Sequence, residues 1–142
     1  MSKEKSCGVV LFRKSKETGV KFLVLHYIPG HWDFPKGHQE KNERDWQTAE
    51  RELKEETGIT ESQIVDGFQE AVNYYFKREN DTVFKEVIYF LAETSVKDIV
   101  HSKEHIGYAW LGFDNAMKKL TFKSSQDVLM KAKKHLDTRH SS

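Results

Sequence analysis

The sequence predicts an α/β (α+β) fold in which a mixed β-sheet is flanked by helices. Short segments rich in Val, Ile, Phe and Tyr alternate along the chain with segments of helical periodicity. Most neighbouring strand segments are separated by a few turn residues, which is typical of hairpins and hence of antiparallel pairs. The length of 142 residues fits one domain spanning residues 1–142, because compact domains run from roughly 50 to 250 residues.

Two strands are predicted near the start of the chain, at residues 7–13 and 20–27, with Thr18 and Gly19 in the turn between them. Residues 28–38 contain both prolines of the chain and two glycines, so we expect a structured loop there. This loop carries aromatic and basic side chains, and loops of that kind are often functional.

A helix is predicted after this loop, because Asn42 is a suitable N-cap and the helical pattern continues to Thr57 before Gly58 stops it. Residues 65–78 and 83–92 are rich in Val, Phe, Tyr and Ile, and they predict a long hairpin.

The hairpin is expected to turn at residues 79–82. Residues 107–111 predict one more short strand, and a helix follows near residues 114–120. Ser124 with Asp127 makes a capping signal for a last helix. The buried face of that helix is expected to contain four apolar residues, Val128, Leu129, Ala132 and Leu136.

The composition argues against several classes of protein. Lys and Arg number 23 against 22 Asp and Glu, so a net charge of +1 predicts no stable binding of nucleic acid through bulk positive charge. The longest apolar runs are a handful of residues, whereas a membrane span needs about 20 and a signal-peptide core about 7–15. The single Cys7 excludes an internal disulfide and suits a reducing compartment. We therefore expect a soluble, cytoplasmic protein without a membrane partner.

The most informative segment is residues 37–59, GHQEKNERDWQTAERELKEETGI. On a helix its three apolar residues share one face, which should pack on the sheet. Glu52, Glu55 and Glu56 lie at i, i+3 and i+4 on a neighbouring stripe, where their charges repel one another. Cations would remove that repulsion, and Mg²⁺ prefers carboxylate oxygens completed by water and substrate phosphate. The alternative interpretation is a solvated acidic face with ion pairs at helical spacing.

The spacing of the whole segment argues against a merely solvated face. It resembles the Nudix box, G-x5-E-x7-R-E-U-x-E-E-x-G-U, in which U is a bulky aliphatic residue. At average residue usage such a match arises by chance roughly once in 10⁹ starting positions. Every fixed position is filled here, by Gly37, Glu43, Arg51, Glu52, Leu53, Glu55, Glu56, Gly58 and Ile59.

The resemblance implies a Nudix hydrolase with an α/β/α sandwich, which uses Mg²⁺ or Mn²⁺ to hydrolyse a nucleoside diphosphate linked to another group. Glu52, Glu55 and Glu56 then become metal ligands, and Glu52 or Glu56 could also take the proton of the attacking water. Glu43 and Arg51 become an ion pair that orients the helix.

The resemblance also assigns roles to the residues around the helix. Gly37 would let the preceding loop turn tightly, with the backbone carbonyl of Lys36 or Gly37 near the metal. Many family members have Pro-Gly where this chain has Lys41 and Asn42, but the loop keeps its length.

A second resemblance runs from about residue 6 to residue 136. The motifs HW-x-x-PKGH, NY, VIYFLAE and HEH-x-x-x-x-WL, with a late phenylalanine, are similar to asymmetric diadenosine tetraphosphate hydrolases of the animal and archaeal type. In such enzymes an adenine lies between two aromatic rings, which implies Tyr74 and Phe122, with Tyr89 a further candidate. Glu104 is implied as one more metal ligand or base. The candidates for phosphate contacts are basic: His31, Lys36, His38 and Lys85.

Several of these residues also have plainer interpretations. Tyr89 lies inside an apolar strand and fits core packing equally well. Phe122 could be a hydrophobic staple for the last helix. Lys85 could be a surface charge, His105 is expected to be structural, and Trp110 is expected in the core.

The expected activity is hydrolysis of diadenosine tetraphosphate to ATP and AMP by a monomeric enzyme. Two alternatives stay open. One is another enzyme of the family, such as an RNA 5′-pyrophosphohydrolase or a hydrolase of another nucleoside-diphosphate-linked substrate, although near-neutral charge weakens the case for RNA. The other is a nucleotide-binding sensor that has lost turnover, which the presence of all three helix glutamates argues against.

Overall fold

A computed structural model of the chain describes residues 1–100 and 102–140. A seven-stranded mixed sheet has the central order β3-β2-β1-β6-β5, with β4 paired to β1 and β7 paired to β2. The described strands are β1 (Ser2–Ser15), β2 (Gly19–Tyr27), β3 (Trp32–Asp33), β4 (Lys36–His38), β5 (Gln63–Arg78), β6 (Asp81–Glu93) and β7 (His105–Leu111). The described helices are α1 (Asp45–Thr57), α2 (Phe113–Lys119) and α3 (Lys123–His140).

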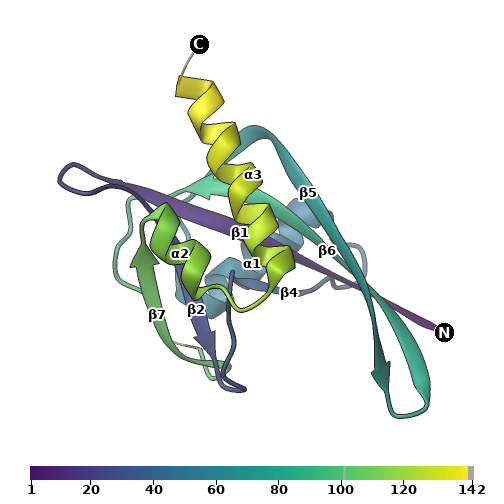
Figure 1. The fold of residues 1–142 in the computed structure, drawn as a ribbon. Helices are drawn as coiled ribbons and strands as arrows, with labels where there is room; N and C mark the ends of the chain where they lie inside the picture. The colour runs from purple at the N-terminus through teal and green to yellow at the C-terminus, as the bar shows by residue number, and fades with distance from the viewer. Residues whose placement is uncertain (101, 141–142) are drawn as a thin grey trace.

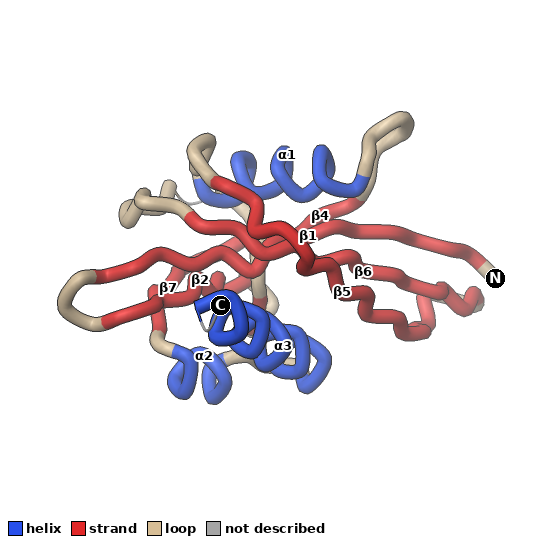
Figure 2. Tube along the Cα trace, turned by 90° about the horizontal axis from the view of Figure 1, so that it is seen from above, coloured by secondary structure: helices blue, strands red, loops and turns tan. Residues whose placement is uncertain are grey.

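The helices lie on both sides of the sheet (Figures 1 and 2). α1 covers one side, and α2 and α3 lie on the other. Because side chains alternate between the two faces of a strand, the sheet contributes to two separate cores. In β1, Val10 packs with α3, whereas Val9 packs in the cluster that includes Leu53 of α1. The predicted mixed sheet flanked by helices is confirmed.

The buried faces of the helices are also as predicted. In α3, the buried residues include Val128, Leu129, Ala132 and Leu136. In α1, Ala49 and Leu53 are buried, and the ring of Trp46 lies 5.4 Å from that of Phe90 in β6, nearly at right angles. This packing fixes which edge of α1 carries the glutamates.

The predicted start of α1 was wrong. The helix begins at Asp45 with Arg44 as its N-cap, and the Arg44 N–H donates to Gln47 Oε1 at 2.8 Å. Asn42 has φ 70°, so it lies in a left-handed turn before the helix. The end is as predicted: Gly58 has φ 77°, and its N–H donates to the carbonyl of Lys54 at 2.8 Å.

The predicted capping signal of the last helix was also wrong. α3 begins at Lys123, which places Ser124 inside the first turn. Asp127 pairs instead with the Lys123 ammonium at 3.3 Å.

Two strand predictions need correction because long-range pairing extends the sheet. The polar residues before the predicted first strand belong to β1, which runs parallel to β6 from Ser2 opposite Val83 to Phe12 opposite Glu93. The expected loop at residues 28–38 contains the short strands β3 and β4. None of the described helices is both long and apolar enough to cross a membrane.

Candidate active site

The three glutamates of α1 lie in three different environments. Glu56 is buried with 2% of its surface exposed, the Glu52 side chain is 13% exposed, and the Glu55 side chain is 56% exposed. The helix packs on β1 through Ala49 and Leu53, so the glutamate nearest this buried face, Glu56, lies in the interior and Glu55 points to solvent. The three glutamates therefore differ in their surroundings, although they have the same side chain and lie on the same stripe of the helix.

Arg51 connects the glutamates to the preceding loop. Its Nε donates to Glu43 Oε2 at 2.7 Å, and its Nη2 donates to the His38 carbonyl at 2.8 Å. Its Nη1 donates to Glu52 Oε1 at 2.9 Å and contacts Glu55 at 3.2 Å. The hydrogen bond from Arg51 holds the pKa of Glu43 at about 2. One guanidinium thus ties the turn before α1, strand β4 and two helix carboxylates together.

Gly37 in β4 lies directly against the Glu52 carboxylate. A Cβ at this position would come within 1.9 Å of Glu52 Cδ, a distance that no side chain can adopt. The absence of a side chain at residue 37 therefore lets Glu52 reach the backbone of the β4 segment.

Glu56 has one bonded oxygen and one without a partner. The Tyr27 hydroxyl lies 2.8 Å from Glu56 Oε2 and 2.9 Å from the Phe34 carbonyl. Glu56 Oε1 is buried and has no hydrogen-bond partner. Burial raises the pKa of Glu56 to about 8. A buried carboxylate oxygen without a donor is the kind of group that a divalent cation satisfies, so this residue fits a metal ligand.

Within residues 1–100 and 102–140, no three acidic or His and Cys side chains converge closely enough to hold a metal as they stand. Arg51 bonds to Glu52 and Glu55, and Tyr27 bonds to Glu56. Glu52 bonds to Arg51 through Oε1, so a cation that it shares with Glu56 would be bound through Oε2 or after a turn of the carboxylate.

Glu104 is exposed just before β7, and its carbonyl accepts a hydrogen bond from Ile28 N–H at 3.1 Å. Burial, above all, raises the pKa of Glu52, and the charge of Glu104 adds to the effect. His105 is buried beside it, with Nε2 lying 2.7 Å from the Glu56 backbone oxygen. The histidine is structural, as expected, and it fixes the end of α1 against β7.

An apolar cavity of about 280 Å³ lies on the α3 side of the sheet. The rings of Tyr74 and Phe122 line it and remain 41% and 44% exposed, so Phe122 is not a buried staple. Tyr89 is 2% exposed and packs edge-on against Phe34, so it forms a wall of the core as well as of the cavity. The other lining residues are Asp33, Lys36, Val72, Asn73, Val87, Ser124 and Ser125.

His31 lies between the cavity and the buried glutamate. Its ring stacks on Tyr27 with 4.9 Å between centroids and an angle of 9°. The ring centroid of Phe122 also lies 5.5 Å from that of His31, with the two rings tilted by 48°. His31 thus contacts both Tyr27, which bonds to Glu56, and Phe122, which lines the cavity. Burial lowers the pKa of His31.

The remaining basic candidates lie on the same side. Lys85 is only 7% exposed, which rules out the interpretation as a surface charge, and burial lowers its pKa. Its Nζ lies 3.4 Å from His38 Nε2. Lys36 Nζ pairs with Asp33 Oδ2 at 3.1 Å.

Sequence reasoning missed three residues of this region. Asp33 is 1% exposed, and its Oδ1 accepts from the Ser125 hydroxyl at 2.7 Å, which joins the end of β3 to the first turn of α3. Tyr27 was predicted only as a strand residue. Asp33 and Ser125 lie at positions that the motifs leave unspecified, so no sequence signal marked them. Trp110 is only partly buried rather than in the core, and its indole N–H donates to the Lys97 carbonyl at 2.8 Å.

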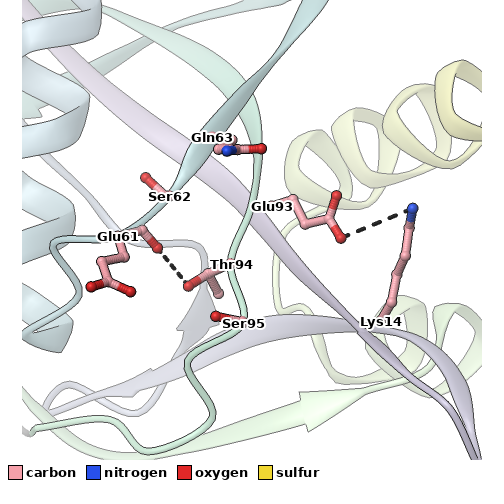
Figure 3. Close-up of a pocket in the computed structure, with 7 residues that line it drawn as sticks. All are labelled: Lys14, Glu61, Ser62, Gln63, Glu93, Thr94 and Ser95. Carbon is pink, nitrogen blue, oxygen red and sulfur yellow. Dashed lines mark hydrogen bonds and ion pairs between the residues drawn. The ribbon is translucent and has the colours of Figure 1, made fainter.

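A larger cleft of about 590 Å³ contains none of the predicted site residues (Figure 3). Its polar groups contact one another: the Thr94 hydroxyl donates to the Glu61 carbonyl at 2.7 Å, and Lys14 Nζ lies 4.0 Å from Glu93. The smaller aromatic cavity beside His31 is therefore the better candidate for a ligand.

Known proteins resemble this chain over most of its length. The pig (Sus scrofa) bis(5′-nucleosyl)-tetraphosphatase [asymmetrical] is 39% identical over 143 residues, covering 93% of this chain and 95% of that protein. The Caenorhabditis elegans protein of the same name is 35% identical and covers 89% of this chain and 92% of its own length. A crystal structure described as a C. elegans Ap4A hydrolase binary complex superposes with a TM-score of 0.83 and 31% identity, covering 95% of this chain and 98% of that one.

The profile of the family described as NUDIX domain matches residues 3–132, which include all seven strands apart from Ser2 of β1, the helix α1, and the residues that line the aromatic cavity. The chain therefore belongs to the NUDIX domain family.

Proposed function

We propose that this NUDIX protein hydrolyses diadenosine tetraphosphate asymmetrically, giving ATP and AMP, with Mg²⁺ as the metal and Mn²⁺ as a substitute. The observation that carries the proposal is the position of His31, whose ring contacts both Tyr27 at the buried glutamate and Phe122 at the aromatic cavity. A nucleoside in the cavity would hold its phosphates next to the carboxylates. The activity named for the pig and C. elegans relatives supports the same substrate.

The proposed metal ligands are Glu56 and Glu52, with Glu55, Glu104 and the Lys36 backbone carbonyl as further candidates. Glu56 has a buried oxygen without a partner, and Glu52 accepts a hydrogen bond from Arg51 through Oε1. When bound, a divalent ion neutralises phosphate charge and lowers the pKa of a bound water. Glu55 is the most exposed of the three helix glutamates and already contacts Arg51, so it is the weakest candidate.

The nucleobase is proposed to lie between Tyr74 and Phe122. Stacking on aromatic rings contributes about 1–3 kcal/mol per base and discriminates little between bases. The chain of phosphates would then pass the basic side chains of His31, Lys36, His38 and Lys85. Lys85 is the strongest of these candidates because its ammonium is buried beside His38.

In the proposed reaction, a water oxygen attacks the phosphorus next to one adenosine. The bond from that phosphorus to the bridging oxygen of the ATP leaving group breaks as the new P–O bond forms. Glu56 or Glu52 accepts the water proton, and both have a pKa raised by burial, which strengthens them as bases.

Hydrolysis in ¹⁸O-labelled water tests this assignment directly. The label is expected in AMP, because the attacked phosphorus stays with that product. Label in ATP would place the attack on the other side of the anhydride and overturn the assignment.

A substrate panel with Mg²⁺ tests the choice of nucleotide. It should contain dinucleoside polyphosphates, ADP-ribose, nucleoside triphosphates and 5′-triphosphate RNA. Diadenosine tetraphosphate is expected to give the highest kcat/KM. A preference for triphosphate RNA would instead support the RNA pyrophosphohydrolase, and a bound dinucleotide that survives for hours with Mg²⁺ would support a sensor.

A further inference from the structure

Three basic side chains beside the cavity, His38, Arg78 and Lys85, form a cluster that also contains a carboxylate of the protein, Glu4. Glu4 lies in β1 directly opposite Lys85 in the parallel pair with β6. Its carboxylate forms an ion pair with Arg78 and lies 3.7 Å from Lys85 Nζ. Among the described residues, it is the one carboxylate within ion-pair distance of Lys85.

This cluster lies next to the proposed path of the substrate. Lys85 is directly opposite Tyr74 in the β5–β6 pair, and its ammonium lies 3.4 Å from His38 Nε2. His38 follows Gly37, which touches the Glu52 carboxylate. In Figure 1 the N-terminal part of β1 runs alongside the β5–β6 hairpin, which brings Glu4 to this place.

Burial makes the position of Glu4 consequential. An ion pair between fully exposed side chains contributes little because water and salt screen it. Lys85 is 7% exposed and the Glu4 side chain is 17% exposed, so their charges are screened less. A phosphate that binds Lys85 would have to share the ammonium with this carboxylate or displace it.

We propose that Glu4 competes with the phosphates of the substrate for Lys85 and Arg78, and so sets how tightly the polyphosphate chain is held. The inference rests on the proposed function only for the identity of the substrate. It predicts that longer phosphate chains, which reach more of the cluster, are penalised most.

Titration calorimetry of the full chain in EDTA tests this without turnover. The ligands are diadenosine tetraphosphate, diadenosine pentaphosphate and AMP, and the variants are Glu4→Gln and Glu86→Gln. Glu86 follows Lys85 in β6, so its side chain points to the opposite face of the sheet. Glu86→Gln therefore removes one negative charge, as Glu4→Gln does, but at a place away from the cluster. A circular dichroism spectrum and a melting curve check each fold.

Glu4→Gln is expected to lower the Kd of both dinucleotides roughly five- to tenfold at low salt, because one repulsive unit charge near phosphate is removed. The effect should be larger for the pentaphosphate, shrink at high salt, and stay below about twofold for AMP. Glu86→Gln is expected to change each Kd by less than about twofold. Glu4→Asp keeps the charge and should bind nearly as the unmodified chain does.

Unchanged or weaker binding by Glu4→Gln would overturn the inference, because Glu4 would then only hold Lys85 and Arg78 in place. Inorganic tripolyphosphate separates this outcome from a wrong choice of substrate. If the chain does not hydrolyse diadenosine tetraphosphate but Glu4→Gln still tightens tripolyphosphate binding, the proposed function fails and the role of Glu4 stands. If the chain hydrolyses diadenosine tetraphosphate but neither this dinucleotide nor tripolyphosphate binds more tightly to Glu4→Gln, the proposed function stands and the role of Glu4 fails.

Discussion

The acidic edge of α1 and the aromatic cavity are built in opposite ways. At the acidic edge, Glu43, Arg51, Glu52 and Glu55 come from one short stretch of chain and are joined by direct polar contacts. The cavity takes its walls from segments far apart in sequence, including Tyr74 of β5 and Phe122 before α3. The proposed chemistry therefore depends on local polar geometry, whereas binding depends on tertiary packing. Changes at the two places should therefore affect different kinetic constants.

The largest effect is expected at Glu56, on the helix that carries the acidic edge. Glu56→Gln should lower kcat about 10²–10⁴-fold, because it removes a proposed metal ligand and base while keeping the shape of the side chain. Steady-state kinetics with Mg²⁺ measures this, and the melting temperature should not fall. Glu50→Gln, on the exposed side of the same helix, is the control. Near-normal activity of Glu56→Gln at saturating Mg²⁺ would remove this helix from the metal site.

The second effect tests the contact between β4 and the helix. Gly37→Ala should lower kcat about 10²-fold, because its Cβ would come within 1.9 Å of Glu52 Cδ and displace the carboxylate. Gly107→Ala is the control, since a Cβ there would meet nothing closer than His26 Cβ at 3.8 Å. Equal kinetics of the two variants would show that the position of Glu52 does not matter for turnover.

A third effect concerns the pH dependence of stability in EDTA. Burial raises the pKa of Glu56 to about 8, above its ordinary value of 4.5. Between those values the folded chain holds more protons than the unfolded chain, so the free energy of unfolding falls as pH rises through this window. A loss on the order of 3–4 kcal/mol between pH 5 and pH 8 is expected from this residue.

The same measurement with Glu56→Gln identifies the group responsible. The variant has no proton to lose there, so its stability should depend less on pH in denaturant titrations across the window. Tyr27 supports this expectation, because its single hydroxyl proton faces two acceptors and a protonated Glu56 would satisfy both contacts. Parallel pH profiles for the two proteins would contradict it.

The smallest effect is expected in the cavity. Tyr74→Ala should raise KM for diadenosine tetraphosphate about tenfold and leave kcat within about threefold, because it removes stacking of the base and leaves the carboxylates untouched. Tyr75→Ala is the matched control, since the neighbouring side chain points to the other face of β5 and is 64% exposed. A fall in kcat of Tyr74→Ala without a change in KM would contradict the proposal that the cavity serves binding and the acidic edge serves chemistry.

Much of the fold could be predicted because its signals are local. Short segments rich in Val, Ile, Phe and Tyr predicted β2, β5, β6 and β7, and helical periodicity predicted the buried face of α3. The polar N-terminal part of β1 could not be predicted, because its pairing with β6 joins backbone groups about 80 residues apart. The start of α1 was misjudged because Asn42 adopts a left-handed turn, which a capping signal does not distinguish from an N-cap.

By itself, the sequence determined the family and the relative positions of Glu52, Glu55 and Glu56, since the geometry of a helix follows from spacing along the chain. Only the tertiary structure decided that Glu56 is buried against Tyr27, that Ser125 bonds to Asp33, and that Glu4 faces Lys85. Burial and charge contacts of this kind join residues distant in sequence, and they depend on how the sheet and helices pack rather than on any local pattern.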